Sequence, residues 1–315
     1  MKRLCVFAHW DRDNIVDDCV IYYLKALKEV CSTIIFVSDT DGTDVSKLDG
    51  IADYCLIKKH GEYDFGSYKR GFFFALENNI EFDELLFAND SCYGPFFPLK
   101  PIFDKMAKKK CDWWGLTRNK YGLCEEKNYL CPPVQPHIQS YFLLLKPQVF
   151  NSDIFLEFIN SIKKEESKGD IIKKYEIGFS QLLYKNGFKS AEYLNLFSYK
   201  LNYLIEKWDV LIKKYKFPFL KTLIVKNGFE ITGEVKTWRK VIQENTDYPL
   251  ELIVSNYNRL KNLHPNVYSE FNIYRKIRFW ILKDFPPRVR YFVILTEKGL
   301  YKILNTICFN KLYKF

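Results

Sequence analysis

The chain has 315 residues, of which 48% are hydrophobic and 27% charged, a composition typical of a folded globular protein and not of a disordered one. Its formal net charge is +10, and residues 275–315 account for +8 of it because they hold ten Lys and Arg against Asp284 and Glu297. The rest of the chain is close to neutral, which argues against a basic nucleic-acid-binding body and predicts that nucleic acid is not a partner.

The first third of the chain alternates short apolar runs with amphipathic segments. This pattern predicts strands at residues 3–9, 33–38, 54–57 and 84–88. It also predicts a helix at residues 15–31 and a second helix that runs through residues 72–76. A β-α-β-α-β order of this kind is typical of a mainly parallel sheet with helices on both faces. The predicted fold class is therefore α/β and Rossmann-like, with a ligand site beyond the carboxyl ends of the strands.

Further along the chain, strands are predicted at residues 112–117 and 138–145, with a long loop at 119–136 between them. Helices are predicted from Ser152 or Asp153 and over residues 176–185, the second ended by Gly187. After about residue 200 the pattern is mostly helical, and Pro286-Pro287 interrupts a basic, aromatic tail. We expect three parts, which are an α/β domain at 1–225, a helical extension at 226–274 and the tail at 275–315.

Two further features bear on location. No apolar run approaches the roughly 20 residues that cross a bilayer, and the run that follows Met1 is too short for a secretory signal peptide. Nine cysteines are scattered without a CxxC pair, which is typical of reduced thiols in the cytosol. The sequence therefore predicts a cytoplasmic protein.

A polar run follows the first predicted strand at residues 9–13. The imidazole of His9 and the carboxylates of Asp11 and Asp13 can hydrogen-bond a nucleotide base or ribose. The two aspartates can equally cap the helix that comes next. Their place at a strand end makes all three candidate nucleotide-binding residues.

The run Asp39-Thr40-Asp41-Gly42-Thr43 after the second strand has two interpretations. Asp39 lies at a strand end and is a candidate for the same nucleotide site. The run also looks like the box of haloacid-dehalogenase-like phosphatases, which pairs a nucleophilic Asp with an acid–base Asp around Mg²⁺. That box normally follows the first strand of its domain, whereas a complete β-α unit precedes it here.

Two glycines bracket a polar stretch at residues 61–71. Gly66 would let the backbone approach a ligand closely, and Asp64 and Lys69 flank it. At the start of a helix, Lys69 would face a phosphate. The alternative is a tight turn with a solvated basic face.

The fourth strand delivers Asn89-Asp90-Ser91 at its end. This run resembles the metal-binding acidic triplet of GT-A glycosyltransferases with one acid replaced. The Asp90 carboxylate can hold Mg²⁺ or Mn²⁺, which would bridge a diphosphate and neutralise charge on a leaving group. The alternative is an Asx turn that ends the strand.

Two later runs, at residues 137–142 and 175–181, supply candidates for the acceptor side. An inverting sugar transfer needs one carboxylate to take a proton from the attacking hydroxyl. Glu176 is the candidate base, and His137 and Gln139 are candidates to contact the acceptor. An acid in the first turn of a helix is also simply favourable there, so Glu176 has a structural interpretation as well.

Seven short motifs, taken in order, resemble the rhamnan synthesis protein F family of glycosyltransferases. They are His9-Trp10-Asp11-Arg12-Asp13, Tyr63-Asp64-Phe65-Gly66, Asn89-Asp90-Ser91-Cys92-Tyr93-Gly94-Pro95, Trp114-Gly115-Leu116-Thr117, His137-Ile138-Gln139-Ser140-Tyr141-Phe142, Tyr175-Glu176 and Pro218-Phe219-Leu220-Lys221. The resemblance implies a GT-A-like fold and a nucleotide-diphosphate sugar donor, typically dTDP-L-rhamnose. It also implies transfer to a lipid-linked oligosaccharide or polysaccharide acceptor in the assembly of a bacterial surface polysaccharide such as O-antigen.

Three hypotheses follow from these features. The first is an inverting glycosyltransferase that works at the inner face of the cytoplasmic membrane, with the basic tail on an anionic bilayer. The second is a phosphatase that uses Asp39 and Asp41, and the third is a non-catalytic membrane-surface protein. One cleft shared by the acids at positions 11, 39, 64, 90 and 176 would favour the first hypothesis.

Overall fold

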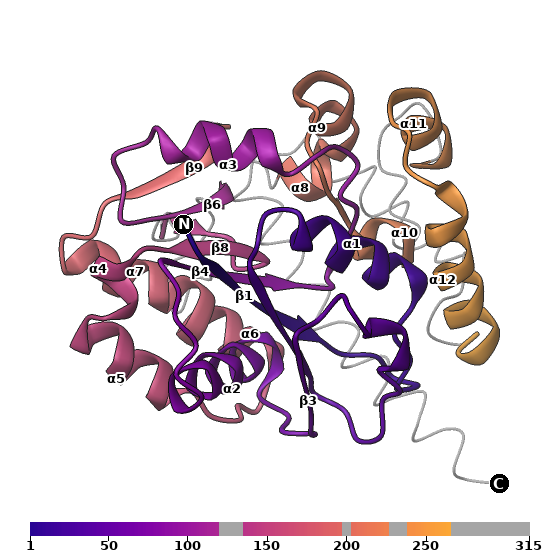
Figure 1. Ribbon diagram of the computed structural model, residues 1–315. Helices are drawn as coiled ribbons and strands as arrows, with labels where there is room; N and C mark the ends of the chain where they lie inside the picture. Colours follow the sequence, from indigo (N-terminus) through magenta and orange to yellow (C-terminus); the bar gives the residue numbers. More distant parts are fainter. Residues whose placement is uncertain (120–134, 197–202, 227–237, 266–315) are drawn as a thin grey trace, which may run out of the picture.

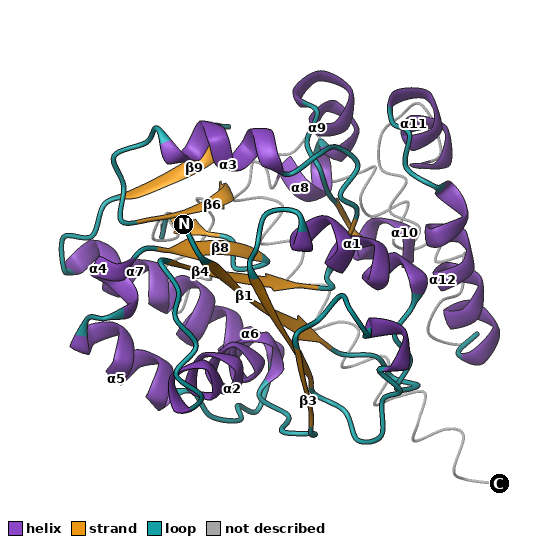
Figure 2. Cartoon of the chain, in the orientation of Figure 1, coloured by secondary structure: helices purple, strands orange, loops and turns teal. Residues whose placement is uncertain are grey.

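The computed structural model describes residues 1–119, 135–196, 203–226 and 238–265 (Figure 1). The predicted tail and most of the loop at 119–136 lie outside these residues. Within them, an eight-stranded sheet has the order β3-β2-β1-β4-β8-β6-β7, and β9 also pairs with β6 (Figure 2). The strands of this sheet are β1 (Arg3–His9), β2 (Thr33–Ser38), β3 (Tyr54–Ile57), β4 (Glu84–Asn89), β6 (Trp113–Asn119), β7 (His137–Ile138), β8 (Phe142–Leu145) and β9 (Ser190–Leu194).

Helices cover both faces of this sheet, as the hydrophobic pattern of β1 requires. Every residue of β1 is buried, and successive side chains point to opposite faces. Cys5 and Phe7 pack with α1 (Asp18–Lys28) and α3 (Lys100–Ala107). Leu4 and Val6 pack with α2 (Tyr63–Glu77), α5 (Asp153–Ser161) and α7 (Gly178–Lys185). The predicted α/β class is confirmed, with a sheet in which β3, β2, β1 and β4 are parallel and β7 and β8 are antiparallel to their neighbours.

The C-terminal helices form a third cluster against α1 and a small hairpin. The hairpin pairs β5 (Cys92–Tyr93) with β10 (Leu220–Lys221) in antiparallel register. The helices around it are α8 (Tyr203–Glu206), α9 (Trp208–Tyr215), α10 (Thr222–Lys226), α11 (Trp238–Asn245) and α12 (Leu250–Leu263). Buried side chains of α9 to α12 pack on Cys19 of α1 and Tyr93 of β5. No helix in the described part of the chain has the length and hydrophobicity to cross a bilayer.

Three predicted boundaries were wrong. The helix predicted through 72–76 begins at Tyr63, because Phe65, Tyr68 and Phe72 already form a buried stripe that two glycines had obscured. The strand predicted at 138–145 is divided into β7 and β8, which pair with β6 at separate places.

The third correction concerns Glu176, which was expected to begin a helix. It lies instead inside a π-helical turn, η2 (Ile172–Ile177), between α6 (Lys168–Ile171) and α7. Turns of this kind are frequent at functional sites. The remaining short helices are η1 (Ser46–Leu48) and α4 (Pro147–Phe150).

Candidate functional site

A cavity of about 770 Å³ opens at the carboxyl ends of β1, β2 and β4. This is the edge of a parallel sheet at which α/β proteins bind ligands. The cavity is lined by predicted site residues from six segments, namely His9, Asp11, Asp39, Asp64, Asn89, Asp90, Ser91, Gln139 and Glu176. The five acids used above to separate the hypotheses therefore share one cleft.

Four predicted residues do not line the cavity. Asp13 is paired with Arg259 of α12 and with His264, the residue that follows α12. Gly66 lies inside α2, where an added Cβ would meet the Cβ of Glu62 at 2.3 Å, so it allows close packing within the protein and not contact with a ligand. Lys69 does not face a phosphate site, because its Nζ donates to the carbonyl oxygens of Asn160 and Ile162.

His137 is the fourth of these residues and stands behind Glu176. Its Nδ1 is 2.9 Å from the carbonyl oxygen of Gln135, which can only accept, so Nδ1 carries a proton. Its Nε2 lies 3.5 Å from Oε1 of Glu176 and pairs with that carboxylate when the ring is doubly protonated. We conclude that His137 orients the carboxylate rather than touching a ligand.

Glu176 has a second set of partners on its other oxygen. Its Oε2 accepts hydrogen bonds from the backbone N–H and the hydroxyl of Ser140, at 3.2 and 2.5 Å. Burial pushes the pKa of Glu176 up, but the contact with the charged ring of His137, the hydrogen bond from Ser140 and the charge of Lys221 outweigh it, so the pKa lies below its ordinary value. Glu176 is therefore ionised at neutral pH and held in one orientation.

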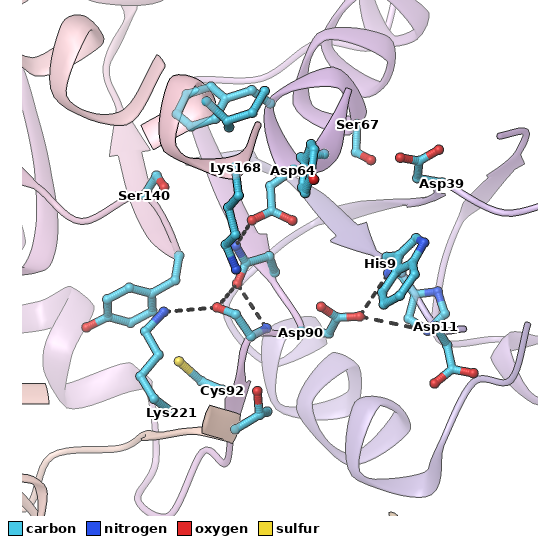
Figure 3. Close-up of a pocket in the computed structure, with 18 of the residues that line it drawn as sticks. His9, Asp11, Asp39, Asp64, Ser67, Asp90, Cys92, Ser140, Lys168 and Lys221 are labelled. Carbon is cyan, nitrogen blue, oxygen red and sulfur yellow. Dashed lines mark hydrogen bonds and ion pairs between the residues drawn. The ribbon is translucent and has the colours of Figure 1, made fainter. Parts of the chain in front are cut away.

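The end of β4 forms a hydrogen-bonded chain across the floor of the cavity (Figure 3). Nδ2 of Asn89 donates to Asp64 at 2.7 Å, and Oδ1 of Asn89 accepts from the N–H of Ser91 at 3.1 Å. The Ser91 hydroxyl in turn accepts from Nζ of Lys221 at 3.0 Å. Asn89 thus makes the Asx turn of the alternative interpretation and also anchors an acid in the cavity.

Asp64 and Asp90 are the two carboxylates nearest this floor. Burial raises the pKa of each to about 6, and each also feels the charge of another acid, Asp90 for Asp64 and Asp11 for Asp90. The N–H of Trp10 donates to Oδ2 of Asp90 at 2.9 Å and favours its charged form. A cation at this place would relieve the mutual repulsion of the acids.

Four lysines to which the sequence analysis gave no role also line the cavity, and they are Lys164, Lys168, Lys221 and Lys226. Within the part of the chain that the structure describes, none of them forms an ion pair. Nζ of Lys221 also lies 4.2 Å from the centre of the Tyr141 ring. Acids line the same cavity, but none of these four ammonium groups is held in an ion pair with them among the described residues, so they can meet the phosphate groups of a ligand.

Comparison with known proteins bears on the family. The model of the family described as rhamnan synthesis protein F matches residues 33–285. The chain belongs to the rhamnan synthesis protein F family.

Curated relatives of this family member are distant. The uncharacterized protein y4gN of Sinorhizobium fredii is 26% identical over 141 residues, which are 44% of this chain and 35% of that protein. The virulence protein VirA of Vibrio anguillarum is 25% identical over 191 residues, 59% of this chain and 57% of that protein. The chain therefore spans about a third to just over half of the length of these relatives.

Among solved structures, the glycosyltransferase GlyE of Streptococcus pneumoniae TIGR4 in its apo form aligns with 85% of this chain and 64% of that chain. The two are 13% identical, with a TM-score of 0.40. A TM-score of this size carries no information on what the present chain binds.

The phosphatase arrangement is not formed in this member of the rhamnan synthesis protein F family. Oδ1 of Asp39 accepts from the N–H groups of His60 and Gly61 at 2.6 and 2.8 Å, so it stabilises a loop. Asp41 is exposed and does not line the cavity. The two aspartates therefore do not face one enclosed pocket as nucleophile and acid–base partner.

A serine, histidine and aspartate also meet beside this loop. Nε2 of His60 is 3.1 Å from the Ser67 hydroxyl, and Nδ1 is 3.5 Å from Asp39. However, the N–H of Glu62 donates to Nδ1 at 3.1 Å, so the neutral ring carries its proton on Nε2. His60 cannot then accept a proton from Ser67, and the arrangement is not a hydrolytic triad.

A divalent cation was predicted at Asp90. The described residues contain no group of three or more His, Cys, Asp and Glu side chains arranged around a metal. Asp64 and Asp90 do present two carboxylates to the cavity, and Mg²⁺ is often held by one or two carboxylates together with substrate phosphates. A cation that binds along with a phosphorylated substrate would meet these two carboxylates in the cavity.

Proposed function

We propose that this protein is a glycosyltransferase that uses a nucleotide-diphosphate sugar. The observation that carries the proposal is the cavity itself, in which four lysines, the half-buried carboxylates of Asp64 and Asp90 and an ionised, oriented Glu176 face one space. A volume of about 770 Å³ is within the range for a ligand of this size. Membership of the rhamnan synthesis protein F family supports it.

The arrangement of side chains suggests how the donor lies. In Figure 3, His9 and Asp39 are on one side of the pocket and Ser140 and Lys221 on the other, with Asp64 and Asp90 between them. We place the nucleoside toward His9 and Asp39, the diphosphate beside Lys168 and Lys221, and the acceptor hydroxyl beside Glu176. Asp64 and Asp90 would hold a Mg²⁺ or Mn²⁺ ion, which, when bound, neutralises charge on the diphosphate.

Transfer in this site proceeds with inversion. Glu176 takes the proton of the acceptor hydroxyl as its oxygen attacks the anomeric carbon from the side opposite the diphosphate. The bond between the anomeric carbon and the diphosphate oxygen breaks, and its electron pair leaves with the diphosphate. Lys168 and Lys221 stabilise the charge that develops on this leaving group, where preorganised charges contribute most to rate.

The finer assignment rests on the family alone. We propose that the donor is dTDP-L-rhamnose and that the acceptor is a growing surface polysaccharide or O-antigen, on a lipid carrier. Such an acceptor lies at the inner face of the cytoplasmic membrane, where the basic residues of 275–315 would meet anionic lipid. The protein would then act as a peripheral membrane enzyme.

A binding screen tests the proposal. Calorimetry with dTDP, UDP and GDP, and then with dTDP-rhamnose and UDP- and GDP-sugars, should identify one nucleotide that binds the full-length chain. In the double variant Lys168→Met and Lys221→Met, the affinity for that diphosphate should fall at least about tenfold because two charge-assisted contacts are lost.

The matched control is Lys185→Met, which removes an exposed cation of α7 that does not line the cavity. Its affinity should equal that of the wild type. If the double variant binds as tightly as the wild type, these two lysines do not contact the diphosphate. A chain that binds no nucleotide diphosphate would contradict the proposed function.

A further inference from the structure

Arg259 of α12 gathers three carboxylates that lie more than 240 residues away in the sequence. Its guanidinium contacts Asp11 at 2.6 Å, Asp13 at 2.8 Å and Asp17 at 2.6 Å. All four side chains are at least four-fifths buried, with exposed fractions of 11 to 19%. The three acids belong to the β1–α1 loop, which we define as residues 10–17.

A second residue of α12 reinforces this contact. Asn256 is one helical turn before Arg259 and is itself buried. Its Nδ2 donates to Asp17, and its Oδ1 accepts from the hydroxyl of Tyr93 in β5. Asn256 also lines the cavity, so α12 supplies part of the cavity wall while it holds the loop.

The β1–α1 loop connects this contact to the candidate site. Oδ1 of Asp11 accepts from the N–H groups of Asp13 and Ile15 at 2.8 and 3.2 Å, and this sets the course of the loop backbone. At the start of the loop, the N–H of Trp10 donates to Asp90. A displacement of the loop would therefore release the hydrogen bond that orients Asp90.

The charge balance of the loop makes it depend on Arg259. Three buried carboxylates close together repel one another and favour an open loop unless a cation joins them. A guanidinium has five donors in a rigid plane and can serve several carboxylates at once, whereas the ammonium of a lysine is a single point charge. Burial opposes the charge of Arg259, but the hydrogen bonds with Asp17 and Asp11 hold its pKa above the ordinary value.

We propose that Arg259 is a positioning residue for the candidate site: by clamping the β1–α1 loop onto α12, it keeps the Trp10 N–H on Asp90. In this arrangement the helical C-terminal part of the chain completes the nucleotide side of the cavity. The clamp itself does not depend on the proposed function. Only the expected effect of the clamp on ligand affinity rests on the proposed function.

Hydrogen exchange of the full-length chain tests the clamp without any ligand. The amides of Trp10, Asp13 and Ile15 should be protected in the wild type and exchange at least about tenfold faster in Arg259→Met, while the amides of β1 and β2 keep their rates. Arg259→Lys should restore part of the protection. The control is Ile253→Val, which trims a buried residue of the same helix and leaves the loop contacts in place.

The outcomes divide as follows. Wild-type exchange rates for Trp10 in Arg259→Met would overturn the proposal. If Arg259→Met does not fold, Asp13→Asn, which weakens one of the three contacts outside the cavity, should show a smaller acceleration at the same amides, and no acceleration would count against the clamp. With the nucleotide found in the screen, Arg259→Met should bind at least about tenfold more weakly and Ile253→Val as tightly as wild type. A chain without nucleotide affinity would contradict the proposed function and leave the exchange result to decide the clamp.

Discussion

Glu176 and Asp90 are carboxylates of one cavity, yet their surroundings shift their pKa values in opposite directions. The charged ring of His137 and a hydrogen bond from Ser140 keep the pKa of Glu176 below its ordinary value, whereas burial raises the pKa of Asp90 to about 6. A difference of this kind commonly separates the roles of two acids in an active site. It favours Glu176 as the base that is charged before the reaction and Asp90 as a group that gains most from a nearby cation.

Replacing Glu176 with Gln tests the role of the base. The amide keeps the shape of the side chain and can still accept from Ser140, so the affinity for the donor should hold. The rate of transfer should fall by roughly 10²–10⁴, because the amide cannot take the proton of the acceptor hydroxyl. Steady-state kinetics with the donor identified by the screen would measure kcat and KM separately.

The matched control for this variant is Glu165→Gln. Glu165 also lines the cavity, but its carboxylate accepts from the Tyr175 hydroxyl at 2.7 Å and pairs with Lys174. The Glu165→Gln variant should therefore keep most of the wild-type rate of transfer. A near-normal rate in Glu176→Gln would contradict the assignment and direct attention to Asp64.

At the scale of the elements, the strands were predictable because burial on both faces produces apolar runs. The run at residues 3–9 and the run at 33–38 became β1 and β2 with the expected bounds. The start of α2 was not predictable, because Gly66 and Gly71 are weak helix formers that tight packing requires here. Helix contacts with other elements outweigh local propensity in such a case.

Gly71 gives a direct test of this packing between α2 and β1. A Cβ added at this position would lie 2.3 Å from Cγ1 of Val6, so Gly71→Ala forces the helix away from the strand. We expect the free energy of unfolding to fall by about 1–3 kcal/mol, as for other overpacked sites. Chemical denaturation monitored by circular dichroism would measure it.

Two further variants separate packing from helix propensity. Gly169→Ala in α6 brings its Cβ no closer than 3.5 Å to the Ser167 hydroxyl, so it should be neutral or slightly stabilising. Adding Val6→Ala to Gly71→Ala should recover part of the lost stability. If Gly71→Ala is as stable as the wild type, α2 can move away from β1 without loss of stability, and the predicted effect of this close packing is wrong.

The site was predictable most directly where its residues follow strands. His9, Asp39 and Asp90 were found because strand ends of a parallel sheet meet at one edge. Lys168 and Arg259 were missed because their partners come from distant segments and no local spacing marks them. Lys221 did carry a signal, since it ends one of the motifs of the family resemblance, but the motif alone gave it no role.

At the scale of the whole molecule, segments from near both ends of the described chain meet beside the cavity. α12 lies beside α1 (Figure 1), and Asn256 and Asp11 line the same space. A boundary at residue 225 between a catalytic domain and a helical extension stays a prediction. The contacts of Arg259 indicate that the extension takes part in shaping the site.

The last prediction concerns the membrane and rests on the sequence of the tail. Arg275, Lys276 and Arg278 stand beside Phe279 and Trp280, and cations near an anionic bilayer each contribute about 1 kcal/mol to binding. In co-sedimentation with phosphatidylglycerol liposomes, the full chain should bind at low salt and be released at high salt. The triple change of these cations to Gln should weaken binding at low salt by roughly 10²-fold, which is three such contributions.

The matched control removes the same charge elsewhere. Lys108, Lys109 and Lys110 are exposed just after α3, and their change to Gln also lowers the net charge by three. If the tail is the contact, this second variant should bind liposomes almost as well as wild type. Equal losses in the two variants would mean that net charge alone drives binding, and a wild-type chain that ignores anionic liposomes would assign the tail a structural role instead.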